Sequence, residues 1–294
     1  MKYLSHSILP LLLAATLLAP SCSSDDDGGT RSTPTGYDIY TAGYKTPGGK
    51  AVATVWKNGT ELYTLTDGTN DAWARSVCVA DGTVYVAGYE QQPDGVVAKL
   101  WENGTLKYTL GSGGGNSYAY AVTAVRGSVY TAGSEEDGGA LTAKVWKDGT
   151  ELHALTDGTQ YADASSVFVS GGAVYTAGYE YNKNGTPVAK VWKDGTVLHT
   201  LTDGKQYAFA NSVFISDGAV YTAGYEGNKN GWYIAKVWKD GTELHALTDG
   251  KQSAHAYSVF VSGGAVYTAG YEYNENGKSV AKVWKDGTVL HTLA

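Results

Sequence analysis

Hydrophobic and polar residues follow a repeating pattern along most of this chain, and residues 164–201 show one unit of it. The segment Ser166 to Ser170 is short, alternating and rich in β-branched residues, which is typical of a half-buried strand. Further strands are expected at residues 174–179, 188–192 and 197–201. The pairs Gly171-Gly172, Asn184-Gly185 and Asp194-Gly195 separate them, and such pairs tolerate the positive φ of tight hairpins. The pattern predicts four antiparallel strands joined by three hairpins.

The unit recurs six times. The glycine of its Val-Tyr-x-Ala-Gly-Tyr-Glu segment occupies Gly43, Gly88, Gly133, Gly178, Gly224 and Gly270. The tryptophan of its Val-Trp-Lys-x-Gly segment occupies Trp56, Trp101, Trp146, Trp192, Trp238 and Trp284. Both markers keep a spacing of 45 or 46 residues, and a period of this length with several short strands per unit is typical of a β-propeller. We expect the repeated tryptophans to pack between the blades.

The longer segment from Thr202 to Asn211 leads from one unit to the next, so it connects an outer strand to the inner strand of the next blade. The first unit begins at Tyr37, already in a second strand, which gives 23 strands instead of 24. We therefore predict an all-β chain with a single β-propeller of six blades, each of four antiparallel strands except one three-stranded blade.

Composition and charge narrow the function classes. The chain is 43% hydrophobic and 17% charged, with a net charge of −7 and no basic run, which argues against nucleic acid as a partner. Its two cysteines, Cys22 and Cys78, are too few for a disulfide framework. We expect Cys78 to be a small buried side chain, because it occupies the repeat position of Phe168, Phe214 and Phe260.

The N-terminus predicts export and anchoring. Lys2 precedes an apolar run from Ile8 to Ala19 that is too short to span a bilayer, as expected of a cleaved signal peptide. The following segment ends at Cys22 and resembles a bacterial lipobox, with Ala19 at the position where Leu is commonest. We therefore expect a lipoprotein signal peptide at residues 1–21, a lipidated acidic tether at 22–36 and the propeller at 37–294.

Two resemblances support this organisation. The acidic cluster after Cys22 resembles the surface-export signal of Bacteroidetes lipoproteins, and the repeats resemble the tandem propeller repeats of Bacteroidetes surface lipoproteins. The segment from Gly171 to Gly178, together with Trp192, is more distantly similar to Kelch blades. These resemblances imply a propeller held at the outer face of the outer membrane, and they imply no particular chemistry.

Most of the polar residues repeat, and we expect them to be structural. The histidines of the outer strands lie on different blades and cannot converge on one metal: His153, His199, His245 and His291. Four aspartates precede glycine and are expected to form turns: Asp67, Asp157, Asp203 and Asp249. Across the second hairpins we expect exposed ion pairs of low energy, Glu90–Lys99, Glu180–Lys190, Glu226–Lys236 and Glu272–Lys282.

The positions that vary within this fixed frame are the candidate binding residues. Before each inner strand the pattern is small-x-Ala-x-Ser/Ala-Val, and the x positions hold Trp73, Arg75, Tyr118, Tyr120, Asp163, Ser165, Phe209, Asn211, His255 and Tyr257. We expect them to surround one mouth of the central channel. Aromatic, charged and amide side chains of this kind suit a sugar or a protein partner. Trp232, in a hairpin on the same face, is a further candidate contact.

The sequence therefore favours a surface-anchored, non-enzymatic propeller that binds a glycan or a protein at the channel mouth. One alternative is a structural or accessory surface protein that docks its partners on the blade rims. A second is a glycoside-active enzyme, which needs two nearby carboxylates, with Asp163 as one and Asp71 as its nearest helper. No cofactor or metal motif is visible, contact with a membrane is expected through the lipid anchor alone, and we expect a monomer.

Overall fold

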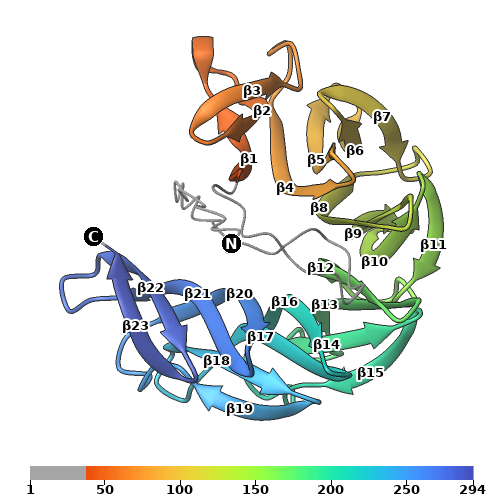
Figure 1. Ribbon diagram of the computed structural model, residues 1–294. Helices are drawn as coiled ribbons and strands as arrows, with labels where there is room; N and C mark the ends of the chain where they lie inside the picture. Colours follow the sequence, from red (N-terminus) through yellow and green to blue (C-terminus); the bar gives the residue numbers. More distant parts are fainter. Residues whose placement is uncertain (1–37, 294) are drawn as a thin grey trace.

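A computed structural model describes residues 38–293. The predictions of a signal peptide, a tether and a lipidated Cys22 concern residues outside this range. Within it the chain forms six antiparallel sheets that follow one another around a central axis (Figure 1). In the part of the chain that is described, no helix is long and apolar enough to cross a membrane.

The six sheets are the blades of a propeller. Blade 1 has three strands, β1 (Tyr40–Lys45), β2 (Val52–Lys57) and β3 (Thr60–Thr64), with a short 3₁₀ turn at Pro47–Gly49. Blades 2 and 3 consist of β4 (Ala72–Ala80), β5 (Thr83–Gln92), β6 (Gly95–Glu102), β7 (Thr105–Leu110), β8 (Ser117–Val125), β9 (Ser128–Asp137), β10 (Ala140–Lys147) and β11 (Thr150–Ala154). Blades 4 to 6 consist of β12 (Ala162–Ser170), β13 (Ala173–Tyr181), β14 (Pro187–Lys193), β15 (Thr196–Thr200), β16 (Ala208–Ser216), β17 (Ala219–Gly227), β18 (Tyr233–Lys239), β19 (Thr242–Ala246), β20 (Ala254–Ser262), β21 (Ala265–Tyr273), β22 (Ser279–Lys285) and β23 (Thr288–Leu293).

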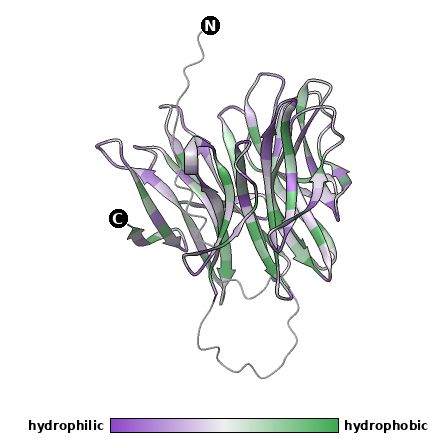
Figure 2. Cartoon of the chain, turned by 90° about the horizontal axis from the view of Figure 1, so that it is seen from above, coloured by the Kyte–Doolittle hydropathy of each residue, from purple (hydrophilic) through white to green (hydrophobic). Residues whose placement is uncertain are grey.

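The predicted architecture is confirmed. Five blades have four antiparallel strands in sequence order and one has three. The first strand of each complete blade lies innermost, where β4, β8, β12, β16 and β20 contact one another in turn. Serines of these strands connect neighbouring blades, because the hydroxyl of Ser166 accepts a hydrogen bond from the Val213 amide and that of Ser212 accepts one from Val259. Figure 2 shows hydrophobic residues along the strands and hydrophilic residues in the connecting turns.

The blades are held together by five nearly identical apolar interfaces. In the fourth, Tyr175, Ala177 and Val191 of one blade meet Ala208, Val213 and Trp238 of the next. The repeated tryptophans Trp101, Trp146, Trp192, Trp238 and Trp284 are at most 2% exposed. Cys78 is also buried and packs in the second interface, as predicted for a small side chain at its position. Small alanines on one side and an indole on the other therefore set the distance between blades.

The repeated glycine allows the two innermost strands of a blade to approach closely. A Cβ on Gly178 would overlap the carbonyl oxygen of Asp163 on the neighbouring strand. At that point the inner strand has a β-bulge, between Ala164 and Ser166. The same overlap arises at Gly88, Gly133, Gly224 and Gly270. Glycine is required there because any side chain would push the bulged strand away.

The repeated polar residues have structural roles, as expected. The His153 ring lies beneath Gly195 in a turn of the next blade, and His199 and His245 lie in the same way beneath Gly241 and Gly287. The carboxylate of each turn aspartate accepts a hydrogen bond from the amide two residues on, at Asp67, Asp157, Asp203 and Asp249. These bonds are Asx turns that fix the crossing between blades.

The predicted Glu–Lys pairs form, but they are more buried than expected. Lys99 pairs with Glu90, and the equivalent pairs form at Lys190–Glu180, Lys236–Glu226 and Lys282–Glu272. Blade 3 has a further pair, Lys144–Glu135, whose side chains are 7% and 2% exposed. The expectation of exposed pairs was wrong because each pair lies on a sheet face that the preceding blade covers.

Within the described range, residues 38–293, one side of the ring is open. Blade 6 presents the apolar face that each earlier blade buries, so Leu293 is 45% exposed whereas the equivalent Leu247 is 6% exposed. Blade 1 presents the opposite face, and Trp56 is partly exposed although its five counterparts are buried. Figure 1 shows β1–β3 and β20–β23 on either side of this opening. The structure therefore describes five closed interfaces and two unpaired faces.

Removing an interblade tryptophan is expected to destabilise the protein in proportion to its burial. We expect Trp238→Ala to lower the free energy of unfolding by about 3–5 kcal/mol, because a buried indole leaves a large cavity. The matched variant Trp56→Ala, at the open side, should cost clearly less. Urea unfolding of both variants measures the difference, and equal losses would contradict the open side.

Candidate functional site

The variable residues lie in the inner strands, at the end where the second hairpins emerge. We expected them in the crossings that lead into these strands, but each blade's two variable positions are already paired or bulged strand residues. The first position pairs with a residue of the second strand, as Asp163 does with Tyr179. The second position is the bulged residue itself: Arg75, Tyr120, Ser165, Asn211 or Tyr257. A bulge leaves its residue out of the ladder and redirects the side chain, so a variable surface is built on a rigid support.

A first arc of aromatic rings runs from blade 1 to blade 3. Trp73 lies between Tyr44 and Tyr89, with ring centroids 6.4 and 5.3 Å away. Tyr89 in turn contacts Tyr118 at 5.1 Å, and Tyr118 stacks with Tyr120 at 6.0 Å. We call these five residues the first aromatic arc. Their rings form a continuous band because contacts within a blade, Trp73–Tyr89 and Tyr118–Tyr120, alternate with contacts between blades, Tyr44–Trp73 and Tyr89–Tyr118.

A second aromatic arc runs from blade 4 to blade 6. Phe209 lies between Tyr179 and Tyr225, with centroids 4.7 and 5.0 Å away. The Tyr225 ring stacks on His255 at 3.9 Å and 9°. His255 contacts Tyr271 at 5.0 Å, and Tyr271 contacts Tyr257 at 5.8 Å. The second aromatic arc consists of these six residues, Tyr179, Phe209, Tyr225, His255, Tyr271 and Tyr257.

The tyrosines that complete both arcs were missed in the sequence because they repeat. Tyr44, Tyr89, Tyr179, Tyr225 and Tyr271 follow the glycine of the second strands, and repetition suggested a structural role. The register places them beside the variable residues, as in the pairs Trp73–Tyr89 and Phe209–Tyr225. Blade 3 is the exception, where Ser134 stands opposite Tyr118. This break in the repeat was a signal in the sequence, because a small hydroxyl replaces a ring at one point of the band.

Asp163 lies between the two arcs, next to this break. The Tyr179 hydroxyl donates a hydrogen bond of 2.5 Å to its Oδ2. Its Oδ1 is buried and has no hydrogen-bond partner among the described residues, and the same holds for the Ser134 hydroxyl oxygen. Burial raises the pKa of the Asp163 carboxyl, although the nearby Ser134 and Tyr179 hydroxyls act against this. The Ser134 hydroxyl lies close enough to lower this pKa but forms no hydrogen bond of normal geometry with the carboxylate. An unsatisfied buried carboxylate is costly, so this oxygen can accept a further donor.

Several tyrosine hydroxyls surround this carboxylate. Burial raises the pKa values of Tyr120 and Tyr179, and the charge of Asp163 raises both further. The pKa of Tyr89 is also raised, by burial first, whereas the nearby positive charge of Arg75 acts in the opposite direction. These phenols therefore stay protonated at neutral pH and remain available as hydrogen-bond donors. Donors, one vacant acceptor and ring faces converge in this part of the site.

The other candidate residues differ in whether their side chains are bonded within the protein or exposed to a ligand. Burial raises the pKa of Tyr257, and the positive charge of Arg75 acts in the opposite direction. The Asn211 side chain donates to the Ala256 carbonyl at 2.8 Å and so connects blades 5 and 6. Trp232 is 41% exposed in the hairpin between β17 and β18, outside both arcs. The structure thus brings most of the candidates together and leaves Trp232 at the edge.

Asp71, the possible second acid, is engaged elsewhere. Its Oδ1 accepts a hydrogen bond of 2.7 Å from the Ala51 amide, and its Oδ2 lies 3.7 Å from the Lys50 ammonium. It therefore holds the crossing between blades 1 and 2. Among the described residues no group of three or more His, Cys, Asp or Glu side chains is placed to hold a metal ion.

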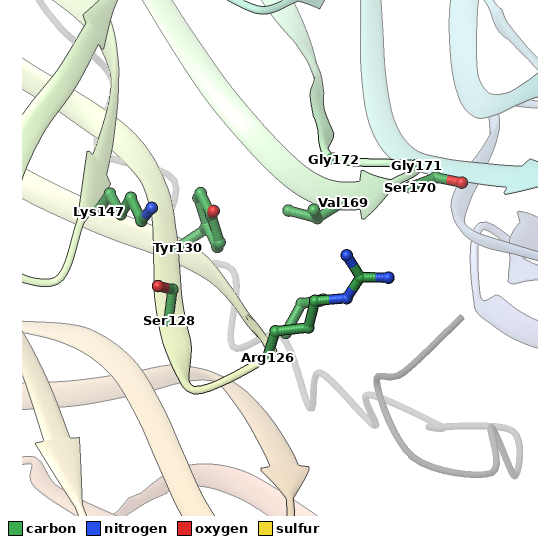
Figure 3. Close-up of a pocket in the computed structure, with 9 residues that line it drawn as sticks. Arg126, Ser128, Tyr130, Lys147, Val169, Ser170, Gly171 and Gly172 are labelled. Carbon is green, nitrogen blue, oxygen red and sulfur yellow. The ribbon is translucent and has the colours of Figure 1, made fainter. Parts of the chain in front are cut away.

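A separate hollow lies at the other end of blades 3 and 4. Figure 3 shows Arg126, Tyr130 and Lys147 on one side and Val169 to Gly172 on the other. It contains none of the variable residues, and the Lys147 ammonium lies 5.4 Å from the centre of the Tyr130 ring. Because it is formed by two neighbouring first hairpins, it is a product of the repeat and not of the variable positions.

Comparison with known proteins adds little to this geometry. No protein-family model matches the chain, and no curated protein matches it. An exo-1,5-α-L-arabinanase from a bovine ruminal metagenomic library is similar in structure, with 13% identity and a TM-score of 0.40 over 78% of this chain and 99% of that one. A mutant α-L-arabinanase from Cellvibrio cellulosa gives 11% identity and a TM-score of 0.36 over 74% and 94%. Similarity at this level carries no argument about the site.

The second aromatic arc is expected to be acid-sensitive through His255. Burial lowers the pKa of this imidazole from 6.5 to about 4, and its Nδ1 lies 3.1 Å from the Tyr271 hydroxyl. Since the unfolded chain binds the proton more readily, stability is lost as the pH falls from about 6.5 to about 4, by up to about 3 kcal/mol.

We expect His255→Phe to lose less stability than the parent protein between pH 7 and pH 4. Urea unfolding at both pH values measures this difference. The aspartates of the Asx turns contribute to the acid loss of both proteins, so the comparison isolates His255. Parallel pH profiles for the two proteins would contradict a buried neutral imidazole.

Proposed function

We propose that this protein is a non-enzymatic binding propeller that holds a glycan at the channel mouth. The observation that carries the proposal is the pair of aromatic arcs on either side of the vacant Asp163 oxygen. Sugar rings present C–H faces that pack on aromatic rings and hydroxyls that need directed acceptors and donors. Trp73, Tyr118 and Phe209 would supply the faces, and Asp163 would accept a hydroxyl. Arg75 would favour a ligand that carries a carboxylate or another anionic group.

The buried position of Asp163 suits recognition. An acceptor that is already desolvated gains more from a ligand hydroxyl than a solvated one, since the cost of burial has been met in folding. A ligand that lacks the hydroxyl would leave the acceptor unpaired, which gives discrimination between similar sugars. Hydrolysis of a glycosidic bond needs a second carboxylate at a defined separation. The Asp71 carboxylate, bound to Ala51, favours binding over that chemistry.

We further propose that Cys22 carries the lipid anchor that places this site at the outer face of the outer membrane. The acidic tether between Cys22 and the propeller would give the domain reach above the membrane surface. A receptor in this place would meet soluble or cell-bound glycans. The proposal of a monomer goes with it, because a tethered propeller needs no partner subunit to expose its channel mouth.

Binding is expected to depend on the aromatic arcs. We expect the propeller, produced from residue 28 to the end, to bind defined sugars on a glycan array. Trp73→Ala and Tyr118→Ala should each weaken binding by about tenfold or more, because each removes a stacking face. Trp232→Ala, the matched substitution outside the arcs, should have a smaller effect. Absence of binding by a folded protein across the array would overturn a glycan ligand and direct the search to protein partners.

Asp163→Asn tests whether this carboxylate is kept for a ligand. Because its pKa is raised in the folded state, the contribution of this carboxyl to stability is most favourable at low pH and is lost as the pH rises through that pKa. The variant removes the charge, so we expect it to be more stable at pH 7, on the order of 1 kcal/mol, and to lose this advantage at acid pH. Glycan affinity should fall. A variant that gains stability and keeps full affinity would show that Asp163 makes no contact with the ligand.

A further inference from the structure

Blade 1 retains the features of a four-stranded blade although it has three strands. Its innermost strand, β1, pairs with β2 and has no second neighbour among residues 38–293. Gly43 occupies the position of the repeated glycine, yet a Cβ there would meet a ring carbon of Trp56 at 3.3 Å and no backbone. In the five complete blades the same glycine faces the bulged inner strand. The space that glycine provides is therefore present in blade 1 and unused by the described residues.

Side chains around this space are exposed where their counterparts are buried. Thr41 is partly exposed, whereas Thr131, Thr176, Thr222 and Thr268 are at most 1% exposed. Trp56 is partly exposed for the same reason. Both side chains would be covered by an inner strand beside β1. Both the backbone and the side chains of blade 1 thus leave room for a fourth strand beside β1.

The apolar face of blade 6 lies on the other side of the opening. In the closed interface between blades 5 and 6, Ala223, Ala235 and Val237 contact the inner-strand residues Ala254, Ala256 and Val259. The equivalent residues of blade 6, Ala269, Ala281 and Val283, are partly or largely exposed. An inner strand added to blade 1 would present its small residues to this face, because each of the five existing inner strands does so. The position is therefore bounded by a hydrogen-bonding edge on one side and an apolar face on the other.

We propose that β1 accepts an extended polypeptide strand from a partner chain, in a position that completes blade 1 and covers the open side. The strand has the chemistry of the five inner strands: small residues at two alternate positions, a bulge, and then Ser-Val or Ala-Val. In four of the five a second β-branched residue follows two positions after this valine. Unpaired strand edges bind such segments through main-chain hydrogen bonds, and side-chain pockets give specificity. This site adjoins the channel-mouth surface, because Tyr44 of the first aromatic arc lies in β1. The argument for it does not depend on the glycan proposal.

The sequence pattern of the inner strands also excludes some partner strands from the position beside β1. A strand with large side chains at the two alternate small positions would clash with the preceding blade, since Ala208 and Ala210 are fully buried in the equivalent place. A strand without the bulge would not follow the close approach that Gly43 permits. The partner is thus defined by sequence pattern as well as by extended conformation.

A labelled synthetic peptide with the sequence of residues 207–216, flanked by lysines for solubility, tests the proposal on the full chain. We expect saturable binding by fluorescence anisotropy. A peptide in which the residues equivalent to Ala208 and Ala210 are leucine should not bind. Gly43→Ala should weaken binding by roughly tenfold or more, because its Cβ occupies the place of the incoming backbone.

The same variant serves as its own folding control. Because no backbone faces Gly43, Gly43→Ala should keep the thermal unfolding midpoint of the parent, whereas Gly224→Ala should lower it clearly. If Gly43→Ala is itself unstable, amide hydrogen exchange in β1 of the parent protein replaces the binding comparison with this variant. We expect the β1 amides to become protected when the peptide is added.

Three results would overturn the proposal. The first is no binding of the peptide to the folded full chain, and the second is equal binding by the parent and Gly43→Ala. The third is self-association of the chain without peptide, seen by sedimentation, that Leu293→Asp abolishes and Gly43→Ala leaves unchanged. That outcome would assign the open faces to blade-on-blade packing of a second copy.

Discussion

The structure depends on the close approach of two backbones inside each blade. A glycine in the second strand lets the bulged inner strand come near, and this approach sets where the inner strand presents its alanines to the preceding blade. The indole of the third strand lies on the same face as these alanines and packs with them against the preceding blade. Because each blade buries its faces only against neighbours, the domain is stabilised as a sum of like interfaces. Among residues 38–293 five of them close, and the sixth is left as two unpaired faces.

The same bulge links the repeated frame to function. In every complete blade it takes one residue out of the ladder, and this residue lies close in sequence to the paired variable residue that precedes the bulge. Side chains at these two positions differ from blade to blade while the apolar interfaces stay nearly the same, although some of them also contact the next blade, as Asn211 does. Asp163 shows that even an unfavourable residue is tolerated at such a position. Its buried carboxylate oxygen has no hydrogen-bond partner among the described residues, and the many other contacts of the fold offset this cost. Binding sites commonly retain such costs, because the ligand removes them.

Sequence patterns were sufficient for the architecture and insufficient for the contacts. Alternation, turn glycines and a constant period predicted the blades, the strand order and the three-stranded first blade. The same patterns located Trp73, Asp163 and His255 as variable positions. They did not reveal the repeated tyrosines that join these into arcs, because that requires the register across a bulge. They also did not reveal that Asn211 is bonded to Ala256, or that the Lys–Glu pairs are covered by the preceding blade, because both depend on how blades stack.

Hydrogen–deuterium exchange of the full chain tests the central claim of five closed interfaces and one open side most directly. The account predicts strong protection of the equivalent second strands β5, β9, β13, β17 and β21, whose two edges are both paired. It predicts fast exchange for the amides of β1 that point away from β2, and intermediate exchange in the outer strand β23 beside the exposed face of blade 6. Protection of β1 equal to that of β13 would contradict the account, since it would mean that blade 1 already has an inner strand.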